Sequence, residues 1–113
     1  MNIHEQKKTC KIIDEFVLYL MRKGQKKVNV DINLDNENET IIKVKTTNLQ
    51  PEVIDKLMTY INQERELEIE EYGWELMGES DVSNELELVG LLIDRLDIEF
   101  EGENCILILR RKH

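Results

Sequence analysis

Residues 27–34 alternate strictly between polar and apolar side chains, and this segment constrains the fold more than any other. Successive side chains of a strand point to opposite faces, so one face of the segment is apolar and the other is polar. The apolar members are Val28, Val30, Ile32 and Leu34. Turn-forming residues follow at 35–38, and residues 40–46 alternate again around Ile42 and Val44. The two segments predict an antiparallel hairpin with one face covered and one face in water.

Residues 5–23 carry apolar side chains at helical spacing, which predicts an amphipathic helix. Asn2 stands three residues before Glu5, as in a capping box, and Gly24 is a natural residue to end the helix. The stripe expected to face the core comprises Ile12, Ile13, Phe16, Val17, Leu20 and Met21.

Two further helices are predicted. One begins at Pro51, which suits a first helical turn, and its apolar face runs to Ile61. The other spans residues 84–96, where a serine or an asparagine can cap its start. Its expected inner face comprises Leu86, Val89, Ile93 and Leu96.

The C-terminal part predicts a second hairpin. Ile98 and Phe100 mark one strand, and residues 101–104 form a turn. Residues 105–109 (CILIL) form a strand that is apolar on both faces and is therefore expected in the middle of a sheet. Residues 110–113 are predicted to be a basic tail.

Helices interleaved with hairpins predict a single α+β domain over residues 1–113. The expected architecture is a two-layer α/β sandwich, with a mixed, mostly antiparallel sheet and the helices on one face. Residues 64–80 show no single period, so helix and strand both stay open for that segment.

The chain has 24 acidic and 15 basic residues, for a net charge of −9. Such a surface repels nucleic-acid phosphates and anionic membranes, so neither is expected as a partner; it suits solubility or a basic partner. No apolar run is long enough to span a bilayer, and the start, MNIHEQKKTC, lacks the apolar core of a signal peptide. These features predict a cytoplasmic protein.

No set of residues predicts a metal or cofactor site. The two cysteines, Cys10 and Cys105, lack zinc-binding spacing and are predicted to be reduced, buried thiols. The two histidines, His4 and His113, stand at the two ends of the chain. There is no P-loop and no GxSxG motif.

Two stretches resemble the GHKL superfamily of ATP-binding domains, which includes anti-sigma-factor kinases and histidine-kinase ATPase domains. Residues 15–24 (EFVLYLMRKG) are similar to the family's N box. Residues 84–111 (NELELVGLLIDRLDIEFEGENCILILRR) look like the C-terminal end of anti-sigma-factor kinases, where a glycine motif opens a helix that two strands follow. The predicted order of elements is also the family's order. The resemblance implies a GHKL ATPase-like fold over nearly the whole chain.

The same resemblance implies that the nucleotide-binding residues are replaced. Glu15 matches the acidic residue that can polarise the attacking group in catalytic members. Tyr19 stands where the family has an Asn that binds Mg²⁺, and Thr46 stands where it has the Asp that reads adenine. Glu85 and Glu87 stand where glycine amides approach phosphate, and glutamate side chains block and repel an anion there.

These replacements predict a non-catalytic regulatory or protein-interaction module that does not use ATP and that binds a protein partner or pairs with itself. The alternative is an ATP-binding serine kinase of the anti-sigma-factor type with a reworked site that uses Glu15. Tyr72, Trp74 and Met77 fall where the family has its mobile lid, and they either fill the core or anchor a partner.

Overall fold

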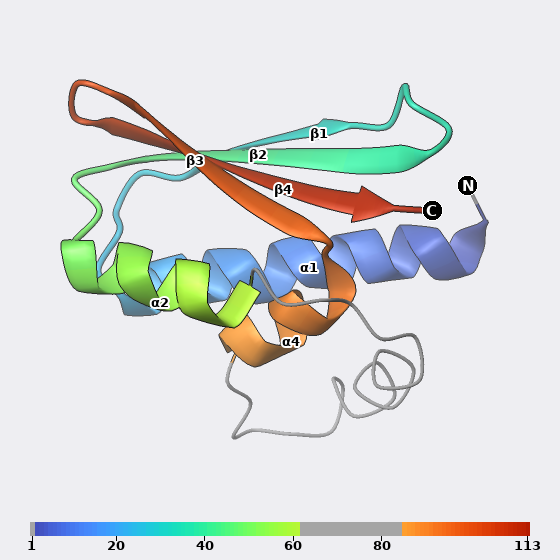
Figure 1. Ribbon diagram of the computed structural model, residues 1–113, viewed down its shortest axis with the longest axis horizontal. Coiled ribbons are helices and arrows are strands. Elements are labelled where there is room, and N and C mark those ends of the chain that lie inside the picture. Colours follow the sequence, from blue (N-terminus) through green and yellow to red (C-terminus); the bar gives the residue numbers. More distant parts are fainter. Residues whose placement is uncertain (1, 62–84) are drawn as a thin grey trace.

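The computed structural model describes residues 2–61 and 85–113, and within them it has two layers (Figure 1). Helices cover one face of a four-stranded sheet in which every pairing is antiparallel, which confirms the predicted α+β class. None of the described helices is long and apolar enough to cross a membrane. The helices are α1 (Ile3–Arg22), α2 (Pro51–Ile61) and α4 (Glu85–Leu92), and the strands are β1 (Asn29–Asn33), β2 (Glu39–Thr47), β3 (Arg95–Glu101) and β4 (Asn104–Lys112).

The sheet has the order β1-β2-β4-β3, so β4 lies between two strands that precede it in the chain. The predicted central position of residues 105–109 is therefore confirmed. β4 is longer than expected and runs to Lys112, because its ladder with β2 continues to the pair Glu39–Lys112. The predicted basic tail is wrong: residues 110–112 belong to this strand.

α1 begins two residues earlier and ends one residue earlier than the predicted range 5–23, but the residues predicted to cap its two ends do so. The Asn2 side chain accepts a hydrogen bond of 2.9 Å from the backbone N–H of Glu5. Gly24 adopts a φ of +90°, a conformation that other residues rarely take, and its N–H donates to the carbonyl of Met21.

The buried face of α1 is rotated from the predicted one. Ile13 and Val17 are only half-buried and Met21 is exposed, whereas the polar residues Glu15 and Tyr19 are buried. The reason is that α1 packs against α4 on one side as well as beneath the sheet, and α4 covers the flank that carries Glu15 and Tyr19. The buried side chains of α1 are Lys8, Thr9, Ile12, Glu15, Phe16, Tyr19 and Leu20.

The third predicted helix is too long at its C-terminal end. α4 ends at Leu92, and β3 already begins at Arg95. Asp94 lies between α4 and β3 and is bonded to β4. Its N–H donates to the carbonyl of Arg110, and its carboxylate accepts from the N–H of Lys112 at 2.6 Å. Leu96 is buried as predicted, but it lies on a strand opposite Leu109.

The core lies between the two layers and holds apolar residues from every described element except β1. Val30 and Ile32 pair with the buried Val44 and Ile42, so the apolar face of β1 points to the helices as predicted. Both side chains nevertheless stay exposed, because the cover of the helix layer ends between β2 and β1. The prediction for the cysteines holds for Cys105, which is buried, and is wrong for Cys10, which is exposed; both thiols are free.

A buried arginine joins the two ends of the described chain. Arg111 of β4 donates two hydrogen bonds, of 2.9 and 2.8 Å, to the carboxylate of Glu5 in α1. It also donates to the carbonyl of Leu92 at 2.6 Å. The contact therefore ties the first turn of α1, the last strand and the C-terminal end of α4 together.

Candidate functional site

Three of the five residues proposed for a vestigial nucleotide site meet between α1 and α4. Glu15 and Tyr19 are one turn apart on the same face of α1, and Glu85 is the first residue of α4. All three are buried, and the charge of Glu85 acts on both of the others. We call Glu15, Tyr19 and Glu85 the α1–α4 polar cluster.

Two cations border the α1–α4 polar cluster. Nη1 of Arg22 lies 2.5 Å from Oε1 of Glu85, and this ion pair joins the last turn of α1 to the first turn of α4. Nζ of Lys11 lies 4.0 Å from Oε1 of Glu15. Arg22 and Lys11 both remain accessible to water, so the charges of the two glutamates are only partly compensated.

Each member of the α1–α4 polar cluster has a buried polar atom that makes no hydrogen bond with the described residues. These atoms are Oε2 of Glu15, the hydroxyl of Tyr19 and Oε1 of Glu85, the last of which is ion-paired with Nη1 of Arg22. Buried polar atoms are nearly always hydrogen-bonded in folded proteins, because leaving one unsatisfied costs about 1–3 kcal/mol. The cluster is therefore a costly arrangement at the junction of the two helices.

Burial changes the proton affinity of the cluster. It raises the pKa of the Glu15 carboxyl above its ordinary value of 4.5, against the opposing effect of Lys11, and the negative charges of Asp14 and Glu85 add to the rise. Burial and then the charge of Glu85 raise the pKa of Tyr19 above 10.0, so its phenol is neutral at neutral pH.

We expect Glu15→Gln to stabilise the protein at neutral pH by about 1 kcal/mol, because it removes a buried, incompletely paired charge. The folded pKa of Glu15 is raised, so the folded protein holds a proton that the unfolded chain has lost, and stability falls as pH rises above 4.5. The variant should lack this part of the pH dependence and match the native protein below that pH. Urea unfolding at a series of pH values measures both effects.

The matched control is Asp14→Asn, which changes the exposed neighbouring carboxylate that pairs with Lys11 at 3.5 Å. It should change the free energy of unfolding by no more than about 0.5 kcal/mol. A loss of stability in Glu15→Gln at neutral pH would mean that the Lys11 pair outweighs desolvation, contrary to the expectation.

Thr46 and Glu87 do not join the α1–α4 polar cluster. Thr46 is buried on β2, and its hydroxyl accepts a hydrogen bond of 2.7 Å from Nε2 of Gln25, which also donates to the carbonyl of Thr47. Glu87 is exposed on α4. Among the described residues, neither makes a hydrogen bond or ion pair with the cluster. Tyr72, Trp74 and Met77 lie outside the described residues.

The polar side of α1 was not predicted. Lys8 is buried, and Arg22 pairs with Glu85, although neither residue belongs to the apolar stripe expected to face the core. Lys8, Glu15 and Arg22 are spaced by seven residues, and this spacing places them on one face of a helix. The regular spacing of charged residues was the available sign that this face meets another element.

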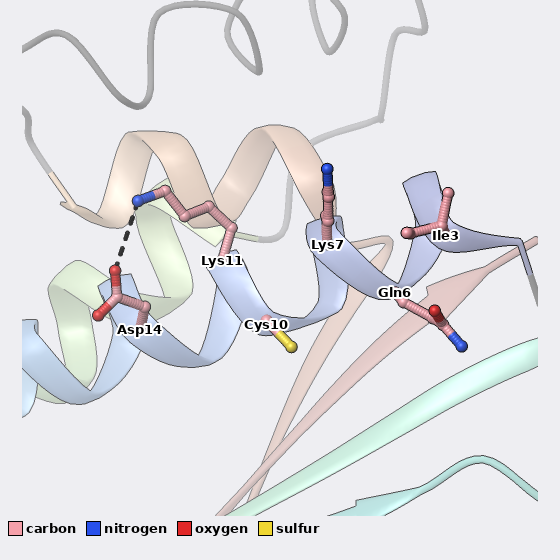
Figure 2. A pocket seen from close by; sticks show the side chains of 6 residues that line it. All are labelled: Ile3, Gln6, Lys7, Cys10, Lys11 and Asp14. Atoms are coloured by element: carbon pink, nitrogen blue, oxygen red, sulfur yellow. Dashed lines mark hydrogen bonds and ion pairs between the residues drawn. The ribbon is translucent and has the colours of Figure 1, made fainter.

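A depression with a volume of about 600 Å³ runs along the N-terminal half of α1 (Figure 2). It is lined by Ile3, Gln6, Lys7, Cys10, Lys11 and Asp14, and Lys11 bonds Asp14 at its rim. It is open and mostly apolar, and it does not include the α1–α4 polar cluster. Among the described residues, no three His, Cys, Asp or Glu side chains are grouped so that they could hold a metal ion.

Comparison with known proteins adds no relative: no protein-family model, no curated protein and no solved structure matches this chain.

Proposed function

We propose that this chain is a non-catalytic regulatory or protein-interaction module that resembles a GHKL ATPase domain and has lost the residues that bind ATP. The order of its described elements supports the resemblance, since a helix, a hairpin, two helices and a second hairpin follow one another. Residues 62–84 connect α2 to α4, where the family has its lid.

The observation that carries the proposal is the position of Glu85. A helix N-terminus binds phosphate when its backbone N–H groups are free and its field is positive. Here the first residue of α4 is a buried carboxylate, which opposes an anion. Arg22 is already paired with that carboxylate.

Tyr19 also supports the loss of ATP binding, because it stands where the family has its Mg²⁺ ligand. Mg²⁺ in nucleotide sites is held by oxygen ligands such as carboxylates and by the substrate phosphates. The Tyr19 phenol is buried and stays neutral, because its pKa is raised by burial and by the charge of Glu85. A neutral phenol beside a carboxylate that is already ion-paired is a poor Mg²⁺ site.

The alternative function is an ATP-binding serine kinase of the anti-sigma-factor type with a reworked site. One observation favours it: Oε2 of Glu15 makes no hydrogen bond with the described residues, and the raised pKa makes this carboxylate a better proton acceptor.

A thermal-shift titration with Mg-ATP tests the proposal, and we expect no change in Tm up to millimolar nucleotide. A ligand that binds only the folded state at about 100 times its Kd stabilises it by roughly 2.7 kcal/mol, which raises the Tm of a domain of this size by roughly 10 °C or more. Magnesium tripolyphosphate at equal ionic strength is the control for binding of the anion alone. A rise in Tm that requires the complete nucleotide would exclude the proposal and favour the kinase.

A further inference from the structure

The outer edge of β1 has no strand partner among the described residues. β1 pairs with β2 on one side only, as the first strand in the order β1-β2-β4-β3. An exposed strand edge presents unpaired N–H and C=O groups, and proteins protect such edges with lysine, proline or a bulge. The segment NVDIN has no lysine and no proline, and Asp31 is its single charged residue.

The same edge exposes apolar side chains. Val30, Ile32 and Leu34 are 39%, 45% and 56% exposed, although the first two share the face of the buried Val44 and Ile42. Two of these residues lie on β1 and Leu34 directly follows it, so alternate positions along this edge present apolar side chains that another strand can cover.

α1 lies below the sheet on the side of β1. α4 contacts both α1 and α2, and α2 contacts β3 at the far edge of the sheet. Figure 1 shows α1 behind α2, on the same side of the molecule as β1. Residues two positions apart on a helix point about 200° apart, so Val17 and Met21 face away from the flank of α1 that meets α4. A shallow depression of about 300 Å³ lies there, lined by Ile13, Asp14, Val17, Leu18 and Met21.

We propose that the occupant of this edge is a second copy of the chain, paired antiparallel through β1 with Ile32 opposite Ile32 of the partner subunit. The inference rests on the proposed function, because it names the partner of an interaction module. The two sheets would join into one, and the half-covered flanks of the two α1 helices would come together beneath the junction.

The register follows from the sequence of the edge. When Ile32 is central, Val30 faces the partner's Leu34, so the apolar residues meet on the covered face. On the wet face Asp31 meets the partner's Asn33, whose amide can donate to the carboxylate. The two-fold symmetry forms this pair twice, because each chain supplies one Asp31 and one Asn33.

Neighbouring registers are less favourable. A register centred on Asp31 places two aspartates directly opposite each other, and one centred on Asn33 places Asp31 opposite the partner's Asp35. Like charges directly opposite destabilise a strand pair. A shift by a single residue would bring apolar side chains opposite polar ones.

Asn33→Asp tests the register by placing two aspartates opposite each other at both symmetry-related pairs. The Oδ1 of Asn33 accepts from the N–H of Asp35 at 2.9 Å, and an aspartate keeps this acceptor, so the fold is preserved. Sedimentation equilibrium over a concentration series should show that the native chain dimerises and that Asn33→Asp weakens the dimer about tenfold.

The double variant Asp31→Asn, Asn33→Asp exchanges the two partners and restores complementarity, so its Kd should return to within about twofold of the native value. Gln50→Glu adds the same charge to the exposed residue before α2 and should leave the Kd unchanged. The inference would be overturned by a native chain that stays monomeric, or by a double variant whose dimer dissociates as readily as that of Asn33→Asp. The nucleotide titration is an independent test. A dimer that binds ATP would exclude only the proposed function, and a monomer that does not bind ATP would exclude only the pairing through β1.

Discussion

Replacing Arg111 with alanine is expected to destabilise the protein by about 3 kcal/mol, since breaking a buried ion pair from one side typically costs 3–5 kcal/mol. Arg111 is 2% exposed and bonds both Glu5 and the carbonyl of Leu92. The variant leaves the carbonyl without this donor and opens a void. The expected loss of stability lies at the low end of that range because water can still reach the Glu5 carboxylate.

Arg110→Ala is the matched control on the same strand. Arg110 pairs with Glu39 at 2.9 Å and with Asp97 at 3.8 Å on the partly exposed surface, so its loss should cost no more than about 1 kcal/mol. Urea unfolding at pH 7 measures both variants. Equal losses would contradict the central role given to Arg111.

The pH dependence gives a second readout for Arg111. Its hydrogen bonds hold the pKa of Glu5 below the ordinary value of 4.5, so the pair contributes stability above that value and loses it as pH falls through the lowered pKa. The alanine variant should lack this acid-sensitive part, and its deficit relative to the native protein should shrink in acid.

Phe16→Ala is expected to cost about 4 kcal/mol, the largest effect among these variants, because removing a buried phenylalanine side chain leaves a cavity. Phe16 lies on α1 within the core and is 1% exposed. A domain of this size has a total stability of about 5–15 kcal/mol, so the variant should be close to unfolding at 37 °C.

The other phenylalanine of the chain is the control. Phe100 on β3 is 63% exposed, and its replacement with alanine should change the free energy of unfolding by no more than about 0.5 kcal/mol. Chemical denaturation compares the two directly. Similar losses in both variants would mean that α1 does not supply the core.

The elements of the fold could be predicted from the sequence because each carries its own period and its own stop residues. The alternation at 27–34 and 40–46 gave the first hairpin, Asn2 and Gly24 gave both ends of α1, and CILIL gave the central strand. These features are local, because side-chain periodicity and helix capping follow from the backbone geometry of the element itself and not from the elements packed against it.

Contacts between elements could not be predicted in the same way. The period of α1 allows several adjacent stripes, and only the position of α4 decides that Glu15 and Tyr19 are buried while Met21 is not. The end of α4 is likewise set from outside, because β4 binds Asp94 through Arg110 and Lys112. The exposure of Val30 and Ile32 depends on where the helix layer stops, and their alternation does not contain that information.

Glu15, Tyr19 and Glu85 meet between α1 and α4, and two of the three form ion pairs with Lys11 and Arg22, to which the sequence pattern assigned no place in a site. Thr46 and Glu87 make other contacts or none, because a resemblance assigns positions and does not assign side-chain packing.

The place of β4 in the sheet has a consequence for the order of folding. β4 is the last element of the described chain, yet β2 and β3 meet only through it. Its end also closes the contact between Arg111 and Glu5, across 106 positions of sequence. Contacts so distant in sequence form slowly, because the chain between them must be ordered first. The sheet should therefore assemble in a late, concerted step, and a nascent chain that has not yet exposed β4 would hold a hairpin and helices without a common core.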